Sequence, residues 1–140
     1  NIVRINKNNN TILLYDNEIY YGIKFNDINQ SIKDHISKII DPNKYINGNF
    51  TINNVKFYSL IGSLTVYFRN NRLDSIGFSP IINENIIDIK NKFENEIKKY
   101  FNVISCICNG KSIIFENNKL YIFSTLTRNE DYYSISIHFE

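Results

Sequence analysis

The clearest hydrophobic pattern in this chain lies in residues 64–80, LTVYFRNNRLDSIGFSP. Apolar and polar residues alternate from Leu64 to Phe68, which is typical of a strand with one buried face. The pair Asn70-Asn71 follows, and because Asn tolerates positive φ well, it predicts a two-residue hairpin turn. The return strand keeps its apolar residues on one face only if a bulge lies at Asp74-Ser75. We therefore expect a β-hairpin whose second strand is bulged.

Parts of this pattern recur along the chain. Asn117-Asn118 also stands between two apolar runs, and Asp16-Asn17 predicts another tight turn. The segment GIKFND precedes the first predicted helix, and GFSPII precedes the second. These similarities favour two degenerate copies of one helix-and-hairpin unit. The alternative is that AT-rich coding makes unrelated strands look alike.

The first predicted helix follows GIKFND. Asp27 and Gln30 fit a capping box, in which each side chain bonds a backbone amide of the first turn. Isoleucines then recur at helical spacing from Ile28 to Ile40 and give the helix one apolar stripe. Asp41-Pro42 is expected to end this helix, because the residue before proline disfavours helical geometry.

The second predicted helix is longer. It is expected to begin at a cap on Asn83 or Asn85 and to run to about Phe101. Its apolar side includes Phe93, and Glu94 is assigned to the opposite, polar side. A helix with one apolar stripe stabilises itself by packing that stripe against a sheet.

The remaining segments predict strands, which leads to a fold class. The predicted strands are Ile2–Ile5, Thr11–Tyr15, Glu18–Phe25, Phe50–Leu60, Leu64–Arg69, Val103–Cys108, Lys111–Phe115, Leu120–Thr125 and Tyr132–Glu140, with a break near Gly62-Ser63. The two helices and these strands predict a single α+β domain over residues 1–140. The hairpins indicate that its strands are antiparallel. Its architecture would be a curved antiparallel sheet with both helices packed on one face.

Composition narrows the class of protein. A chain of 140 residues can bury about 68% of its unfolded surface in one core. No run approaches the roughly 18 apolar residues that a membrane span needs. The formal net charge is +2 and the basic residues are scattered, so nothing indicates nucleic-acid binding. The chain has 24 Asn and 27 Ile but no Ala, Trp or Met, as expected from a gene of low GC content.

The two cysteines, Cys106 and Cys108, are two positions apart in a predicted strand. Neighbours at this spacing are poorly placed to form a disulfide, so we expect two reduced thiols and a cytoplasmic protein. The first ten residues also lack the apolar segment of a signal peptide. His35 and His138 are too far away in sequence to complete a metal site, so no metal is expected.

A search for catalytic motifs leads to a binding protein. The sequence contains no GxSxG, P-loop, GxGxxG or HExxH pattern. Cys106 or Cys108 could pair with His138 for nucleophilic catalysis. The alternative is that Cys106 and Cys108 are small core residues and His138 is a solvated strand residue, without a catalytic role. We therefore predict no enzymatic activity.

The whole chain resembles the immunity proteins of bacterial polymorphic toxin systems, such as contact-dependent growth inhibition. The likeness rests on a small AT-biased chain, an α+β sheet, YYGIKFND before a short helix, and LTVYFRNNRLDSIGFSP as a central hairpin. The resemblance implies a cytoplasmic protein that binds one cognate toxin domain and blocks its active site or substrate surface. It also implies neither a cofactor nor catalysis.

The alternative function is a small ligand-binding or regulatory α+β module. An apolar pocket of about 300 Å³ or more would favour that alternative. An immunity protein is instead expected to have no deep pocket, and to present a flat or protruding surface rich in aromatic and acidic groups.

Strand alternation predicts where such a partner would bind. Residues assigned to the core are Leu64, Val66, Phe68, Leu120 and Ile122. Tyr67, Tyr121 and Phe123 then point to the opposite face, where they would form an exposed patch. Asp74 and the pair Glu130-Asp131 would add negative charge that attracts a basic toxin. The alternative is that the aromatic side chains only pack against one another across strands.

Overall fold

The structure is a computed structural model that describes residues 2–14, 16–38, 40–104, 112–117 and 119–140. Its strands are β1 (Ile2–Asn6), β2 (Thr11–Leu14), β3 (Asn17–Tyr20), β4 (Gly48–Phe57), β5 (Leu60–Arg69), β6 (Arg72–Pro80), β7 (Asn102–Ile104), β8 (Ser112–Asn117), β9 (Leu120–Leu126) and β10 (Tyr133–Phe139). Its helices are α1 (Gln30–Ser37), α2 (Pro42–Asn47) and α3 (Ile86–Ile97), with a 3₁₀ turn at Phe25–Asp27. The strands form one 10-stranded sheet in the order β3-β2-β1-β4-β5-β6-β10-β9-β8-β7.

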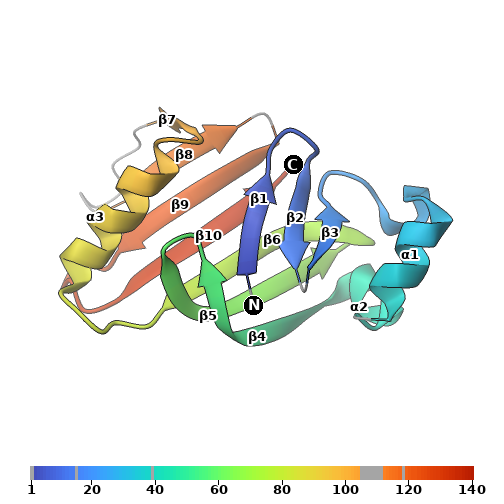
Figure 1. The fold of residues 1–140 in the computed structure, drawn as a ribbon, viewed down its shortest axis with the longest axis horizontal. Coiled ribbons are helices and arrows are strands. Elements are labelled where there is room, and N and C mark those ends of the chain that lie inside the picture. Colours follow the sequence, from blue (N-terminus) through green and yellow to red (C-terminus); the bar gives the residue numbers. More distant parts are fainter. Residues whose placement is uncertain (1, 15, 39, 105–111, 118) are drawn as a thin grey trace.

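The predicted antiparallel sheet with two helices on one face is wrong in two respects. The sheet is mixed, because β1 runs parallel to β4 and pairs Ile2 with Lys56 and Val3 with Phe57. Of the described helices, only α3 lies across a face of the sheet, whereas α1 and α2 lie beyond its end (Figure 1). The space expected for the first helix is taken by a ribbon of β1, β2 and β3, which folds over the same face as α3.

The core lies between the main strands on one side and this ribbon with α3 on the other. The ribbon contributes buried Ile12, Leu14 and Ile19. Farther along the core, the ring of Phe93 from α3 stacks on Phe57 at a centroid distance of 5.9 Å. All of these residues belong to one continuous hydrophobic cluster. The core therefore holds both covering elements to a single sheet.

The central hairpin matches its prediction. Asn70 and Asn71 have φ angles of 54° and 66°, so both residues of the turn adopt the left-handed conformation that Asn tolerates. Tyr67 pairs with Ser75 and Phe68 pairs with Leu73, which leaves Asp74 as the extra residue of a bulge. The five residues assigned to the core, Leu64, Val66, Phe68, Leu120 and Ile122, are buried, which confirms that assignment.

The two expected repeats do not form equivalent structures. Strand β3 lies at one edge of the sheet, and the chain leaves it at Gly22, which has a φ of 79°. The second copy instead supplies β6, a central strand, and leads into α3. The similar segments GIKFND and GFSPII therefore occupy different positions, and the structure contains no helix-and-hairpin duplication in the residues it describes.

The first predicted helix is divided into two short ones. Asn29 takes the capping role predicted for Asp27, since its Oδ1 accepts the Ser31 amide at 2.9 Å. Asp41-Pro42 begins α2 instead of only ending the preceding helix, with Asp41 Oδ1 accepting the Asn43 amide at 3.0 Å. Proline suits the first helical position because its missing amide proton has no partner there.

Helix α3 begins as predicted, but one of its residues was misassigned. Asn85 caps it by accepting the amides of Ile87 and Asp88, and the helix ends at Ile97, before the predicted Phe101. Glu94 was assigned to the polar side, yet it is only 4% exposed. Its carboxylate can be buried because Ser124 and Lys90 each bond one of its oxygens. Among the described residues, no helix has the length and hydrophobicity needed to cross a bilayer.

The turn between β4 and β5 lies earlier than predicted. Phe57 pairs with Leu60, so Tyr58 and Ser59 form the turn. Gly62, where the break was expected, lies within β5 between Val55 and Pro80. A Cβ at this glycine would lie 2.1 Å from the carbonyl oxygen of Ser79, so Gly62 permits close strand packing and is not a turn residue.

Candidate functional site

The face of the main sheet that points away from α3 and the ribbon is the first candidate site. We call it the open face, because no described helix or strand lies over it. Strand pairing arranges its side chains in rows across β4, β5, β6, β10 and β9. One row is Asn49, Tyr67, Ser75, His138 and Tyr121, and the next is Thr51, Thr65, Gly77, Ser136 and Phe123. The same alternation that buries the core residues thus creates this surface.

Three aromatic side chains predicted for this face are present on it. Tyr67 is 43% exposed, while Tyr121 and Phe123 are half-buried. The Phe123 ring meets the imidazole of His138 edge to face at a centroid distance of 5.3 Å. Phe123 therefore packs across strands, as the alternative interpretation of these aromatic residues expects. Tyr67, in contrast, remains accessible.

Hydroxyl groups occupy much of the space between these rings. Thr51 and Thr65 hydroxyls lie 3.0 Å apart, and Ser136 Oγ lies 3.1 Å from His138 Nε2. Near the far end of the face, the Ser79 hydroxyl contacts the exposed Tyr132 hydroxyl at 2.9 Å. The hydroxyl groups are neutral, so the middle of the open face combines aromatic rings with hydrogen-bonding groups.

Charge enters at one border of the open face. Tyr121 bonds the carboxylate of Glu140, and this hydrogen bond raises the pKa of the Tyr121 hydroxyl above its ordinary value. Asp74 lies near the same border, in the bulge of β6 beside Tyr67 and Ser75. Asp74 is separated from the other two predicted acidic residues. Glu130 and Asp131 lie in the β9–β10 loop, at the opposite end of β10.

Asp131 has a structural role in that loop. Its carboxylate accepts a hydrogen bond from the Thr127 hydroxyl at 2.5 Å, and its amide donates to the same hydroxyl oxygen at 3.1 Å. Glu130 has a φ of 58° and donates its amide to the Thr127 carbonyl. The six predicted partner residues therefore do not form one patch: Tyr67, Asp74, Tyr121 and Phe123 lie together, and Glu130 and Asp131 lie apart.

The groups considered for catalysis can be placed only in part. Cys106 and Cys108 lie outside the described residues, so their reduced state stays a prediction. His138 lies on the open face, where Phe123 and Ser136 contact it. The described residues contain no group of three or more His, Cys, Asp or Glu side chains that could hold a metal ion.

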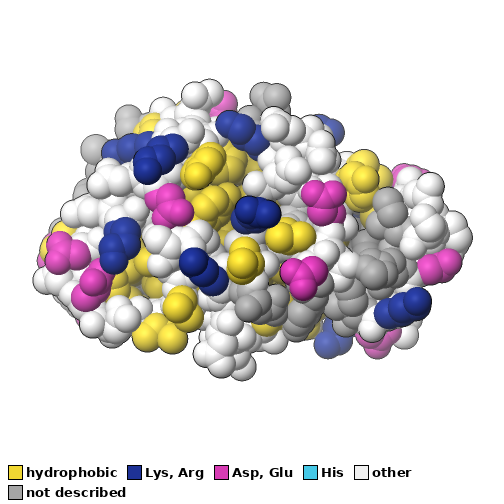
Figure 2. Space-filling model, in the orientation of Figure 1, with side chains coloured by type: hydrophobic (Ala, Val, Ile, Leu, Met, Phe, Trp, Pro, Cys, Tyr) yellow, Lys and Arg dark blue, Asp and Glu magenta, His cyan; other side chains and the backbone are white. Residues whose placement is uncertain are grey.

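A second candidate site, which sequence reasoning missed, is a cleft between β1 and the C-terminal end of α3. Its volume is about 580 Å³, and its walls come from β1, the β2–β3 hairpin, the β4–β5 turn and the residues after α3. Figure 2 shows this side of the molecule, where hydrophobic side chains and several basic side chains gather between α3 and β1. The volume exceeds the roughly 300 Å³ that would favour a ligand-binding module, but the lining is polar and basic as well as apolar.

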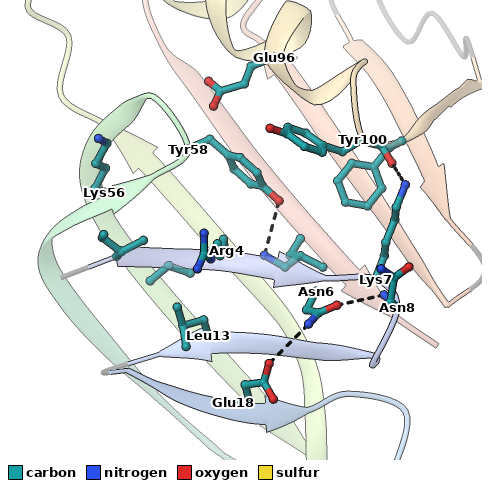
Figure 3. Close-up of a pocket in the computed structure, with 14 residues that line it drawn as sticks. Arg4, Asn6, Lys7, Asn8, Leu13, Glu18, Lys56, Tyr58, Glu96 and Tyr100 are labelled. Carbon is teal, nitrogen blue, oxygen red and sulfur yellow. Dashed lines mark hydrogen bonds between the residues drawn. The ribbon is translucent and has the colours of Figure 1, made fainter.

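Tyr58 forms the centre of this cleft (Figure 3). Its ring packs edge to face on Phe93, with a centroid distance of 6.3 Å, and its hydroxyl accepts the amide of Ile5 at 3.4 Å. Burial raises the pKa of Tyr58 to about 12. The only sequence signal for this site is the Tyr58-Ser59 turn. The alternation hides it, because it predicts one continuous strand over residues 50–60.

Comparisons with known proteins give no further guide to the site. No protein-family model matches the chain, and no curated protein or solved structure matches it either.

Proposed function

We propose that this chain is a cytoplasmic immunity protein that binds a cognate bacterial toxin domain and acts without catalysis or a cofactor. The observation that carries this proposal is the open face, where Tyr67, Phe123 and Tyr121 lie among neutral hydroxyl groups. Protein interfaces are enriched in aromatic residues and depleted of charge at their centres. A sheet face left uncovered with this composition is well suited to a partner protein.

The distribution of charge suggests how the partner would approach. The centre of the face would supply most of the binding free energy through Tyr67 and Phe123. Asp74 and Glu140 at the border would act mainly on the association rate, because rim charges steer encounter more than they stabilise the complex. The toxin would then be held by apolar and hydroxyl contacts, with its active site or substrate surface occluded by the sheet.

The test is co-expression of this chain with the toxin domain encoded beside it. We expect a stable complex and restored growth of cells that make the toxin. Tyr67→Ala and Phe123→Ala should each weaken binding by about 2 kcal/mol or more, as hot-spot residues do. Binding is measured by calorimetry on purified proteins, and melting temperatures establish that the variants are folded.

Tyr100→Ala is the matched control. Tyr100 is 48% exposed, close to the 43% of Tyr67, but it lies at the cleft and not on the open face. It should leave toxin affinity unchanged. Absence of any complex with the neighbouring gene product would refute the proposed function. A complex that tolerates Tyr67→Ala and Phe123→Ala as well as Tyr100→Ala would refute the open face as the binding site.

A further inference from the structure

The cleft between β1 and α3 lies on the other side of the molecule from the open face, so the proposed partner surface does not account for it. Its walls bring together Arg4 and Lys7 of the first hairpin, Lys56 of β4, and Glu96 and Tyr100 from the end of α3 (Figure 3). These residues are far apart in sequence. Their convergence around one cleft is therefore a property of the fold.

Most charged groups of the cleft already have protein partners. The Lys7 ammonium donates to the Tyr100 carbonyl and lies 5.8 Å from the centre of the Phe101 ring. Glu96 Oε2 accepts the Ser59 amide at 3.1 Å, and Glu18 Oε1 accepts from the Asn6 side chain at 3.5 Å. These contacts fix the two carboxylates and one of the three cations in place.

Arg4 and Lys56 differ from these groups. No carboxylate among the described residues forms a salt bridge with either side chain. Both line the same cleft, and Arg4 is close enough to Tyr58 for its charge to act on the phenol. Lys56 lies at the rim, and its ammonium is turned away from Tyr58 (Figure 3). Arg4, which lies beside the Tyr58 phenol and has no carboxylate partner, therefore provides the electrostatic half of an anion site.

Tyr58 adds a neutral donor beside Arg4. Since its oxygen accepts the Ile5 amide, its own proton remains available to a group in the cleft. Tyr58 also has a φ of 56° at the first position of the β4–β5 turn, a conformation that a bulky side chain rarely adopts. The first position of a two-residue hairpin turn requires a positive φ, so the turn fixes the backbone of Tyr58.

The rings of Tyr58 and Tyr100 supply an apolar wall. Their centroids are 6.0 Å apart and their planes are inclined by 37°. Tyr100 is exposed, so a flat ligand could contact its ring without displacing core side chains. The nearby carboxylates of Glu18 and Glu96 disfavour a ligand with several negative charges.

We propose that this cleft binds a small aromatic monocarboxylate, with its carboxylate held by Arg4 and the Tyr58 hydroxyl and its ring against Tyr58 and Tyr100. Arginine suits this role because its planar fork matches both oxygens of a carboxylate. The ligand would be bound without chemical change. Because the cleft and the open face share none of these residues, the site can exist whether or not the protein binds a toxin.

Phenylacetate is the probe, titrated into the ¹⁵N-labelled protein and followed by amide NMR shifts. We expect saturable shifts confined to β1, the Tyr58-Ser59 turn and the end of α3. Acetate, which lacks the ring, and 2-phenylethanol, which lacks the charge, should each bind at least about tenfold more weakly. Phenyl phosphate, with its greater charge, should also bind more weakly than phenylacetate.

Variants test each part of the site. Arg4→Gln should weaken phenylacetate binding about tenfold, and Tyr58→Phe should weaken it severalfold. Lys44→Gln, which removes an exposed cation from α2, is the matched control and should change affinity by less than about twofold. Circular dichroism verifies that each variant is folded.

Several results would overturn the proposal. Shifts that do not saturate, or that spread over the whole protein, would exclude a site for this probe. Equal losses in Arg4→Gln and Lys44→Gln would reduce the effect to net charge. Equal affinity for acetate would exclude the aromatic wall, tighter binding of phenyl phosphate would exclude the preference for one charge, and unchanged affinity in Tyr58→Phe would exclude the phenol.

Discussion

The two faces of the main sheet are built from the same strands but have opposite surroundings. On β5, Leu64 and Val66 are fully buried, while Tyr67 between Val66 and Phe68 is 43% exposed. Alternation explains why these residues separate into two sets. It does not determine what covers each set. The core face is covered by α3 and a ribbon of strands, whereas the open face keeps its aromatic residues accessible.

Polarity also differs between the faces in a way that residue type alone does not predict. The core face contains a buried polar network, in which Ser124 Oγ donates to Glu94 Oε2 at 2.8 Å and lies 2.6 Å from the Tyr133 hydroxyl. Lys90 completes the network with a 2.9 Å salt bridge to Glu94. A carboxylate can be buried here because each of its oxygens has a partner. Burial also raises the pKa of Tyr133, which keeps it protonated as a donor.

Phe93→Ala should have the largest effect on stability. The side chain is fully buried between α3 and the sheet, so its removal leaves a cavity and should lower the free energy of unfolding by about 3–5 kcal/mol. Phe123→Ala, on the open face, is the matched control and should lose at most about 1 kcal/mol. Urea denaturation followed by circular dichroism measures both. Equal losses would mean that the open face is part of the core.

Ser124→Ala should have the next largest effect. It removes the donor to one oxygen of buried Glu94, and an unsatisfied buried acceptor costs about 1–3 kcal/mol. Ser136→Ala is the matched control, because this serine lies on the open face where water can replace its contacts, and it should change stability by less than about 0.5 kcal/mol. The same urea titrations compare them. A negligible loss in Ser124→Ala would show that the network does not hold α3 to the sheet.

Alkaline pH should lower the free energy of unfolding by about 1 kcal/mol near pH 11 for each of two buried tyrosines. Burial raises the pKa of both Tyr21 and Tyr58 from 10.0 to about 12. The unfolded chain loses these two protons first. Their contribution to stability is therefore constant below pH 10, falls between pH 10 and about 12, and levels off above.

Tyr58→Phe isolates one contribution to this pH dependence. The variant has no phenol at position 58, so its unfolding free energy should fall less steeply above pH 10 than that of the unchanged protein. Urea midpoints measured at several alkaline pH values give the two slopes. Identical slopes would assign the alkaline loss to other groups.

Local patterns predicted the parts of the fold that local physics determines. The central hairpin, the bulge at Asp74 and the Asn85 cap of α3 each depend on a few neighbouring residues. The placement of Tyr67, Tyr121 and Phe123 opposite the core also followed from alternation alone. Together with Asp74 in the bulge, these three aromatic residues are the part of the predicted partner patch that lies together.

The errors arose where distant residues decide the outcome. The isoleucines from Ile28 to Ile40 have helical spacing, but isoleucine has modest helix propensity, and caps at Asn29 and Asp41 favour two short helices. Glu94 is buried because Ser124, thirty residues away, meets it. The cleft likewise requires the parallel pairing of β1 with β4, which no turn signal encodes.

Gly77→Ala should produce the smallest effect and the only gain. Gly77 lies on the open face outside the left-handed φ region, and a Cβ there would meet only the Tyr67 ring at 4.0 Å, an ordinary contact. Because glycine within a strand is less favourable than alanine, we expect an increase in unfolding free energy of about 0.5–1 kcal/mol. Gly62→Ala is the matched control on the core face, where the added methyl would collide with the Ser79 carbonyl and must destabilise the protein. Urea midpoints of the two variants should therefore move in opposite directions. A loss of stability in Gly77→Ala comparable to that in Gly62→Ala would mean that the open face is as tightly packed as the core face, and the contrast between the two faces would fail.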